Sequence, residues 1–141
     1  MKVSYPVRIW REEEVYMAQG LKSLDNVLTY GASLDEALKN VREALTGVLG
    51  AMLDQGEKIP QVKARAAKSI YWIEPALSVA IPILIRRARE EAGLTQAELA
   101  EKLGVTYQAV QKWERSGTNP TVATLERILL ALGKRLELQV A

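Results

Sequence analysis

The 141-residue sequence contains no cysteine and no histidine. The absence of cysteine excludes disulfide bonds and thiolate metal sites. The absence of histidine removes the most usual general base and the commonest metal ligand. We therefore expect neither a metal ion nor another cofactor.

Long apolar runs are missing as well. No run approaches the roughly 18 residues that a membrane-spanning helix needs, and the N-terminus has no signal-peptide pattern. Hydrophobic residues make up 48% and charged residues 26% of the chain, which is the balance of a globular protein. We expect a cytoplasmic protein without a membrane partner, folded as one ordinary domain or two small ones.

The net charge of +2 is small, but it is unevenly distributed. Residues 1–60 carry 7 basic and 9 acidic side chains, residues 61–80 carry 3 and 1, and residues 81–141 carry 9 and 7. The basic excess in the later half is a weak indication of an anionic partner for that part.

The first half of the chain predicts a small sheet covered by one helix. β-branched and aromatic residues favour strands, and they gather at 3–10, 15–19, 26–30 and 69–74. The letters REEE form a charged turn between the first two strands. Ser33 begins S-L-D-E, a capping box for a long helix with one apolar stripe. Residues 1–74 are therefore predicted as a β-β-β-α-β domain of an α+β protein.

From Pro75 the pattern becomes helical. Helices are expected at about 83–92, 96–103, 107–115 and 122–132. Pro82 either kinks a helix or marks the start of one. The letters RLELQV, residues 135–140, predict a closing strand. Residues 75–141 are thus expected to form an all-α domain with a C-terminal strand.

The stretch GLTQAELAEKLGVTYQAVQKWE, residues 93–114, contains two short helical patterns. Thr95 begins T-Q-A-E, a second capping box, Gly104 permits the positive φ that ends a helix, and Thr106 caps the next one. This arrangement is typical of a helix-turn-helix. From the two capped helices alone, a helical hairpin with a merely solvated polar face is an open alternative.

The second of these helices presents a row of polar and charged side chains, namely Tyr107, Gln108, Gln111, Lys112 and Arg115. An α-helix fits the major groove of DNA, where glutamine can bond to adenine N6 and N7. The N-terminal end of the first helix, with Thr95 and Gln96, is suited to a phosphate.

Residues 81–132, which include LTQAELAEKLGVTYQAVQKWERSGTNPTVATLERILLAL, resemble the Cro/CI (Xre) type of helix-turn-helix. The resemblance implies base contacts from Tyr107, Gln108 and Lys112. It implies phosphate contacts from Thr95, Gln96 and Arg115. The full set of expected DNA-binding residues is Thr95, Gln96, Thr106, Tyr107, Gln108, Gln111, Lys112 and Arg115.

The same resemblance implies a structural ion pair between Arg89 and Glu114. Tyr107 departs from the family pattern, in which glutamine or serine is more usual at this position. Its ring either packs on a thymine methyl group or contacts only the DNA backbone, so the target sequence stays open.

The segment VYMAQGLKSLDNVLTYGASLDEALKNVREALTGVLGAMLDQGEKIP resembles the HicB family of antitoxins. Strand, turn and strand are followed by T-x-G-x-[ST]-x-x-E-A, a long helix and GE-x-IP. The resemblance implies a partial RNase H-like domain that neutralises HicA, a small RNA-cleaving toxin, by protein–protein contact. The letters GLKSLDN replace the common Pro-Gly-Cys turn, which leaves the details of the partner contact open.

Carboxylates are almost absent from the predicted strands. Metal-dependent nucleases of the RNase H kind need several of them converging from strands, whereas Glu12, Glu13 and Glu14 fall in the REEE turn. We therefore expect no enzyme. Three other carboxylates, Asp35, Glu36 and Glu43, lie along the long helix. They form either a solvated helix face or a surface that meets a basic toxin.

The closing strand has too little sheet nearby to pair within its own domain. Pairing with a copy of itself removes the exposed edge, so we expect a homodimer or a higher even-numbered oligomer through Leu136, Leu138 and Val140. Two recognition helices roughly 34 Å apart would then contact a palindromic operator. The sequence predicts an antitoxin that also represses its own operon. The alternative is an Xre-type repressor whose first domain senses a ligand or only assembles subunits.

Overall fold

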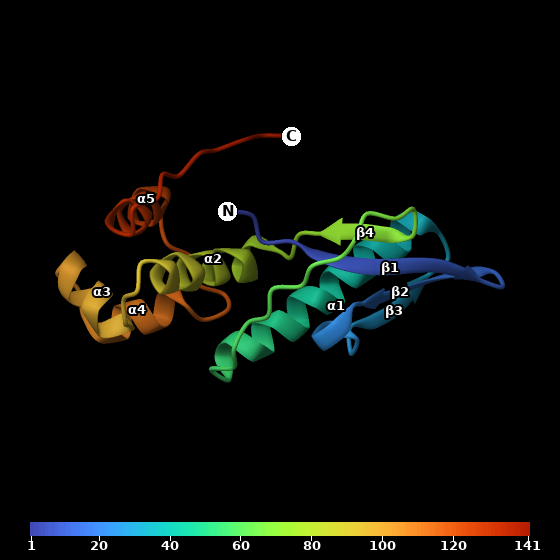
Figure 1. Ribbon diagram of the computed structural model, residues 1–141, viewed down its shortest axis with the longest axis horizontal. Helices are drawn as coiled ribbons and strands as arrows, with labels where there is room; N and C mark the ends of the chain where they lie inside the picture. Colours follow the sequence, from blue (N-terminus) through green and yellow to red (C-terminus); the bar gives the residue numbers. More distant parts are fainter.

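The computed structural model describes all residues, 1–141, and has an α+β architecture (Figure 1). Its antiparallel sheet has the strand order β3-β2-β1-β4. The strands are β1 (Tyr5–Glu12), β2 (Val15–Gly20), β3 (Leu28–Gly31) and β4 (Ile70–Ile73), with a short 3-10 turn, Lys22–Leu24, before β3. The predicted order β-β-β-α-β is confirmed. The REEE turn is shorter than predicted, because β1 continues to Glu12 and only Glu13 and Glu14 remain outside the strands.

Helix α1 (Leu34–Asp54) covers one face of this sheet. Val41, Leu45 and Leu49 of the predicted apolar stripe are fully buried. Gly31 lies so close to the first turn of α1 that an added Cβ would stand 2.4 Å from the backbone nitrogen of Ala37. Only glycine fits there, so it fixes how closely β3 can approach the helix.

The N-terminal cap of α1 differs in one detail from the predicted capping box. The Ser33 hydroxyl accepts a hydrogen bond from the Glu36 amide at 3.1 Å, as expected. The Glu36 carboxylate, however, accepts from the amide of Ala32 at 2.9 Å instead of from Ser33. The carboxylate therefore satisfies a donor one residue earlier in the chain.

Helix α2 (Leu77–Glu91) is continuous through Pro82, so the proline does not start a separate helix. Proline has no N–H, which leaves the carbonyl of Ser78, four residues earlier, without its helical partner. That carbonyl accepts a hydrogen bond from the Gly117 amide at 3.0 Å. A segment beyond the helix-turn-helix thus compensates for the proline.

Two apolar cores share helix α2. Val79 and Ile83 pack with the sheet and α1, whereas Ile85 and Ala88 pack in the second core. The second core is completed by three further helices, α3 (Gln96–Leu103), α4 (Tyr107–Trp113) and α5 (Val122–Ala131). Figure 1 shows α2 running between the sheet with α1 and the group of α3, α4 and α5.

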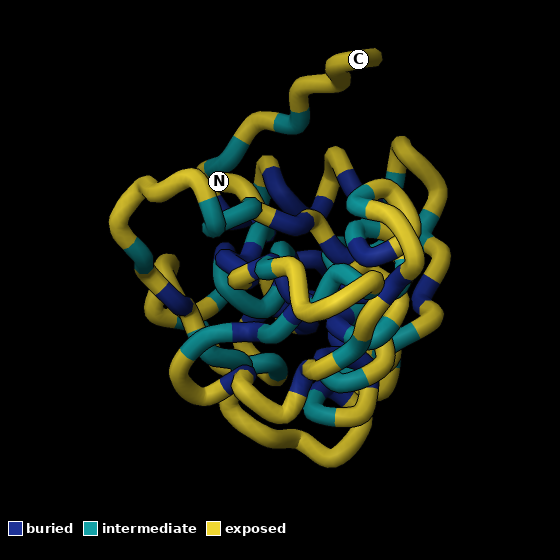
Figure 2. Tube along the Cα trace, turned by 90° about the vertical axis from the view of Figure 1, so that its right-hand side faces the viewer, coloured by how far each residue is buried: buried dark blue, intermediate teal, exposed yellow.

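The predicted closing strand does not form in the single chain. Residues 134–141, here called the C-terminal tail, are neither helix nor strand. Figure 2 shows the tail as an exposed segment that extends away from the body of the protein. A strand needs hydrogen bonds to a neighbouring strand, and no strand pairs with the tail in one copy of the chain. No helix of the protein is both long and apolar enough to cross a membrane.

Candidate nucleic-acid interface

The helix-turn-helix is held by the local signals that the sequence contains. The Thr95 hydroxyl accepts from the Glu98 amide and the Glu98 carboxylate accepts from the Thr95 amide, both at 3.1 Å. Gly104 ends α3 with a φ of +67°, and Thr106 accepts from the Ala109 amide at 3.1 Å. These caps fix where α3 and α4 begin.

Helix α4 presents most of the expected row to solvent. Gln108, Lys112 and Arg115 are exposed, Tyr107 is 44% exposed, and Gln111 is half-buried. Val110, on the opposite side of the helix, is fully buried against the second core. This arrangement leaves polar donors and acceptors on one side of α4, where they could meet the edges of bases.

The two candidate phosphate contacts at the N-terminus of α3 differ in exposure. Thr95 is exposed, while Gln96 is half-buried. The Gln96 side-chain amide donates to a carboxylate oxygen of Glu114 at 3.2 Å. Gln96 thus contacts the residue that directly follows α4.

Glu114 is the centre of a buried ion cluster. It is only 1% exposed, and Arg89 contacts both of its carboxylate oxygens, through Nε at 2.7 Å and Nη2 at 2.8 Å. Arg86, whose Nε lies 3.5 Å from the same carboxylate, is a second cation that the sequence did not indicate. The hydrogen bonds that Arg89 donates to the Glu114 carboxylate raise the pKa of Arg89 above its usual value, although burial opposes the shift. The cluster connects α2, α3 and the end of α4.

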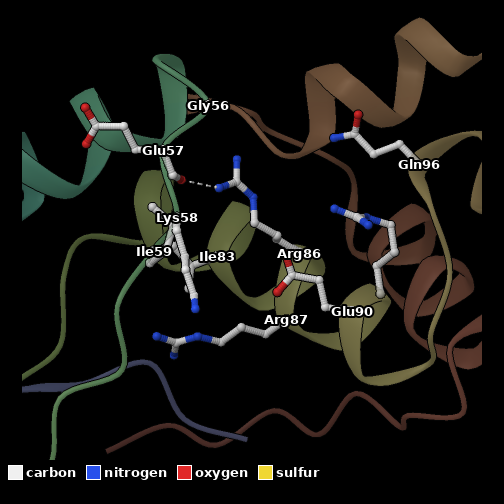
Figure 3. A pocket seen from close by; sticks show the side chains of 10 residues that line it. Gly56, Glu57, Lys58, Ile59, Ile83, Arg86, Arg87, Glu90 and Gln96 are labelled. Atoms are coloured by element: carbon white, nitrogen blue, oxygen red, sulfur yellow. Dashed lines mark hydrogen bonds between the residues drawn. The ribbon is translucent and has the colours of Figure 1, made fainter.

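A cleft of about 620 Å³ lies next to this cluster, between the loop after α1 and helix α2 (Figure 3). Its arginines make contacts within the protein, whereas Lys58, which also lines the cleft, makes no hydrogen bond or ion pair. Arg86 donates to the Glu57 carbonyl at 2.9 Å, and Arg87 donates to the Tyr5 hydroxyl at 2.7 Å and to the Pro60 carbonyl at 2.9 Å. These guanidinium groups therefore attach the 57–60 loop to α2. Burial raises the pKa of the Tyr5 hydroxyl, and Arg87 partly opposes that shift.

A second connection joins α1 directly to the end of the recognition helix. Asp54 accepts from the Ser116 amide at 3.0 Å and from the Ser116 hydroxyl at 2.6 Å. The two residues are 62 positions apart, and no local pattern in the sequence indicates the contact. The sheet-and-α1 part of the chain therefore lies beside the candidate DNA-binding helix.

The other predicted site residues lie outside this region. In the C-terminal tail, Leu136 is half-buried against the second core, whereas Leu138 is 78% and Val140 97% exposed. The three helical carboxylates, Asp35, Glu36 and Glu43, are all exposed on α1. No three acidic side chains gather in the geometry of a metal site.

Comparison with known proteins identifies both parts of the chain. A helix-turn-helix family, HTH_3, matches residues 85–139. The antitoxin HicB of Pseudomonas fluorescens (strain Pf0-1) is 31% identical over 111 residues, which are 78% of this chain and 75% of that protein. The chain belongs to the HicB antitoxin family. The expected resemblance to HicB and to Xre-type helix-turn-helix proteins is confirmed.

The chain is also similar to other proteins. Antitoxin HicB 1 of Photorhabdus laumondii is 28% identical over 136 residues, 96% of this HicB-family chain and 86% of the relative. An uncharacterised HTH-type transcriptional regulator of Methanothermobacter thermautotrophicus is 47% identical over 51 residues, 36% of this chain and 74% of that protein. The crystal structure of the Burkholderia pseudomallei antitoxin HicB has a TM-score of 0.46 at 16% identity, covering 76% of this chain and 89% of that one. The assignment rests on the sequence relatives.

Proposed function

We propose that this HicB-family protein neutralises a HicA-type RNA-cleaving toxin and represses its own operon. In this proposal residues 1–74 form a toxin-binding unit, and residues 75–141 form a unit that binds operator DNA and dimerises. One observation carries it: similarity to HicB antitoxins extends over 95–96% of the chain in several relatives, across both units.

The DNA-binding half of the proposal is supported by the exposed row on α4. Gln108 is the residue we propose to contact a base, because its amide can bond bidentately to adenine. Thr95, at the positive end of α3, and Arg115, just beyond α4, are proposed phosphate contacts. The buried Glu114 cluster would hold α3 and α4 in a fixed relation while they bind.

The dimer is supported by the C-terminal tail. Leu138 and Val140 are highly exposed, and the tail has no strand partner in a single chain. We propose that two tails pair about a two-fold axis, which would bury both side chains and satisfy the backbone groups. A dimer would carry two recognition helices to successive half-sites, roughly 34 Å apart.

The toxin-binding half is tested by co-expression with the short neighbouring reading frame. Growth should be restored when this chain is induced together with a toxic neighbour, and the two proteins should co-purify as a stable complex. A toxic neighbour that neither binds this chain nor is neutralised by it would contradict the proposal.

The alternative function is a repressor whose first unit senses a small ligand. The 620 Å³ cleft beside α2 is the place to look for such a ligand. Its arginines, however, are held by Glu57, Tyr5, Pro60 and Glu114. An anion bound to the arginines would have to displace these contacts, and Lys58 is the one lining cation that makes none.

A further inference from the structure

The face of the sheet turned away from α1 carries its own apolar surface. Tyr5, Val7 and Ile9 of β1 belong to the core with α1. Because side chains alternate along a strand, Arg8 and Trp10 point to the other face.

The strand register extends this second surface across the sheet. Residues directly opposite one another in antiparallel strands lie on the same face. Trp10 lies opposite Met17, and Met17 lies opposite Tyr30. Arg8 and Leu28 both lie opposite Gln19, and on the other edge Trp72 lies opposite Pro6. We call this set the outer sheet face, defined by Arg8, Trp10, Met17, Leu28, Tyr30 and Trp72.

The outer sheet face is exposed although it is largely apolar. Leu28 is 53%, Tyr30 61% and Trp72 48% exposed, and none of the six residues belongs to either apolar core. Arg8 is exposed as well, and Trp10 and Met17 between the two edges of the sheet are half-buried. Exposed apolar side chains gathered on one face are typical of an interaction site. Its content of tryptophan, tyrosine and arginine is that of residues that dominate binding energy at protein interfaces.

The charges around the patch decide which partner fits. Glu12, in the same strand and on the same face, stands next to Glu13 and Glu14 at the tip of the hairpin, and none of the three forms an ion pair. Single-stranded RNA would need several cations along the face, and only Arg8 is present. A second copy of this chain that docked through its own outer sheet face would offer the acidic tip only one cation, its Arg8. A basic protein surface complements it better.

We infer that the outer sheet face, together with the acidic tip Glu12–Glu14, docks the cationic RNA-binding surface of the toxin. The inference rests on the proposed antitoxin function, because a nuclease that holds RNA must present cations to phosphates. Docking there would cover the RNA-binding surface of the toxin and exclude its substrate.

The exposed side of α1 is the competing surface and supplies the control. Asp35 and Glu43 are exposed on α1, but Lys39 and Arg42 lie on the same helix and are exposed as well. Glu36 is engaged by the amide of Ala32. This surface is mixed in charge and lacks large exposed apolar side chains, so it fits a basic partner less well than the outer sheet face.

The test is a binding measurement between the full-length chain and the purified toxin, held catalytically inactive by substitution. Tyr30→Ala combined with Trp72→Ala should weaken binding by at least about 30-fold. Converting Glu12, Glu13 and Glu14 to glutamine should slow association and reduce its salt dependence. Asp35→Asn combined with Glu43→Gln should change affinity less than about threefold. Unchanged thermal unfolding and operator binding would show that the variants are folded.

The outcomes separate the inference from the proposed function. If the unmodified chain binds the toxin and the outer-face variants bind equally well, the inference is wrong while the antitoxin function stands. If only the combined Asp35→Asn and Glu43→Gln variant lost affinity for the toxin, the docking surface would lie on α1 and the inference would also be wrong. If the unmodified chain does not bind the toxin, both fail. Retention of single-stranded RNA that depends on Tyr30 and Trp72 would instead assign the face to RNA.

Discussion

Replacing Glu114 by glutamine isolates the contribution of the buried ion cluster. The substitution keeps the shape of the side chain and removes only its charge. Arg89 and Arg86, whose side chains are 12% and 15% exposed, then lose the carboxylate that compensates them. One amide oxygen can accept from Arg89, but the amide nitrogen would face a guanidinium donor, so at least one hydrogen bond is lost.

The expected magnitude follows from the burial of the cluster. Removing one partner of a buried ion pair destabilises a protein by about 3–5 kcal/mol, because the remaining charge is uncompensated. For a chain of this length, that loss corresponds to a fall in Tm of roughly 10–20 °C. Urea and thermal unfolding followed by far-UV circular dichroism measure both quantities. The operator affinity of Glu114→Gln should fall too, because the substitution removes the carboxylate that holds Gln96 at the end of α4.

Glu91→Gln is the matched control. Glu91 pairs with Lys134 at 2.9 Å, but the two side chains are 54% and 41% exposed. Water screens this pair, so its loss should cost less than about 1 kcal/mol. If Glu114→Gln were no more destabilising than Glu91→Gln, the reasoning from burial would be refuted.

Four further predictions concern DNA binding, assembly, pH dependence and the contact between the two cores. Gln108→Ala should weaken binding to the correct operator by about 1–3 kcal/mol and leave binding to random DNA nearly unchanged, as measured by fluorescence anisotropy; equal losses on both would contradict a base contact. Deleting residues 135–141 should convert the dimer to a monomer in light scattering, and an unchanged dimer would show that the assembly lies elsewhere. Because burial raises the pKa of Tyr5 above its ordinary 10.0, the associated stability should be complete below that pH and fall as the pH rises through the folded-state value. Tyr5→Phe should therefore lack this extra loss of stability above the ordinary pKa of 10.0 in urea unfolding, and an identical pH dependence in both proteins would contradict the effect of Tyr5. Asp54→Ala should lower the free energy of unfolding by about 1–2 kcal/mol, because the hydrogen bonds to Ser116 are lost. Asp25→Ala is the control, because the Asp25 carboxylate is exposed and makes no hydrogen bond or ion pair.

Local features of this fold were predictable because their causes lie within a few residues of each other. The capping box at Thr95 and the positive φ of Gly104 follow from side chains and backbone preferences at neighbouring positions. The same is true of the long helix after Ser33, whose apolar residues repeat at three and four positions and define its buried face.

Contacts between distant segments were not predictable from local patterns, and the pair Arg89–Glu114 was expected only through the family resemblance. Ser116 follows the recognition helix, and nothing in its neighbourhood indicates that Asp54 approaches it. The bond from Gly117 to Ser78 depends on the free carbonyl created by Pro82 and on the packing of two segments 39 residues apart (117 − 78). The C-terminal tail failed as a strand for a related reason, since its β propensity requires a partner that a single chain does not provide.

The outer sheet face was predictable from the sequence only in part. The alternation in β1 could have indicated that Arg8 and Trp10 share a face. The opposition of Met17 and Tyr30 needed the register of the sheet. Patterns in one strand therefore show that a second face exists, and only the assembled sheet shows how far it extends.

The central claim is that this chain neutralises a toxin, and the most direct test is inhibition of RNA cleavage in a purified system. The toxin from the neighbouring reading frame is incubated with RNA while this chain is titrated in, and the cleavage rate is followed. Cleavage should stop when the two proteins reach a fixed stoichiometric ratio. Cleavage that continues undiminished in excess of this chain would contradict the claim.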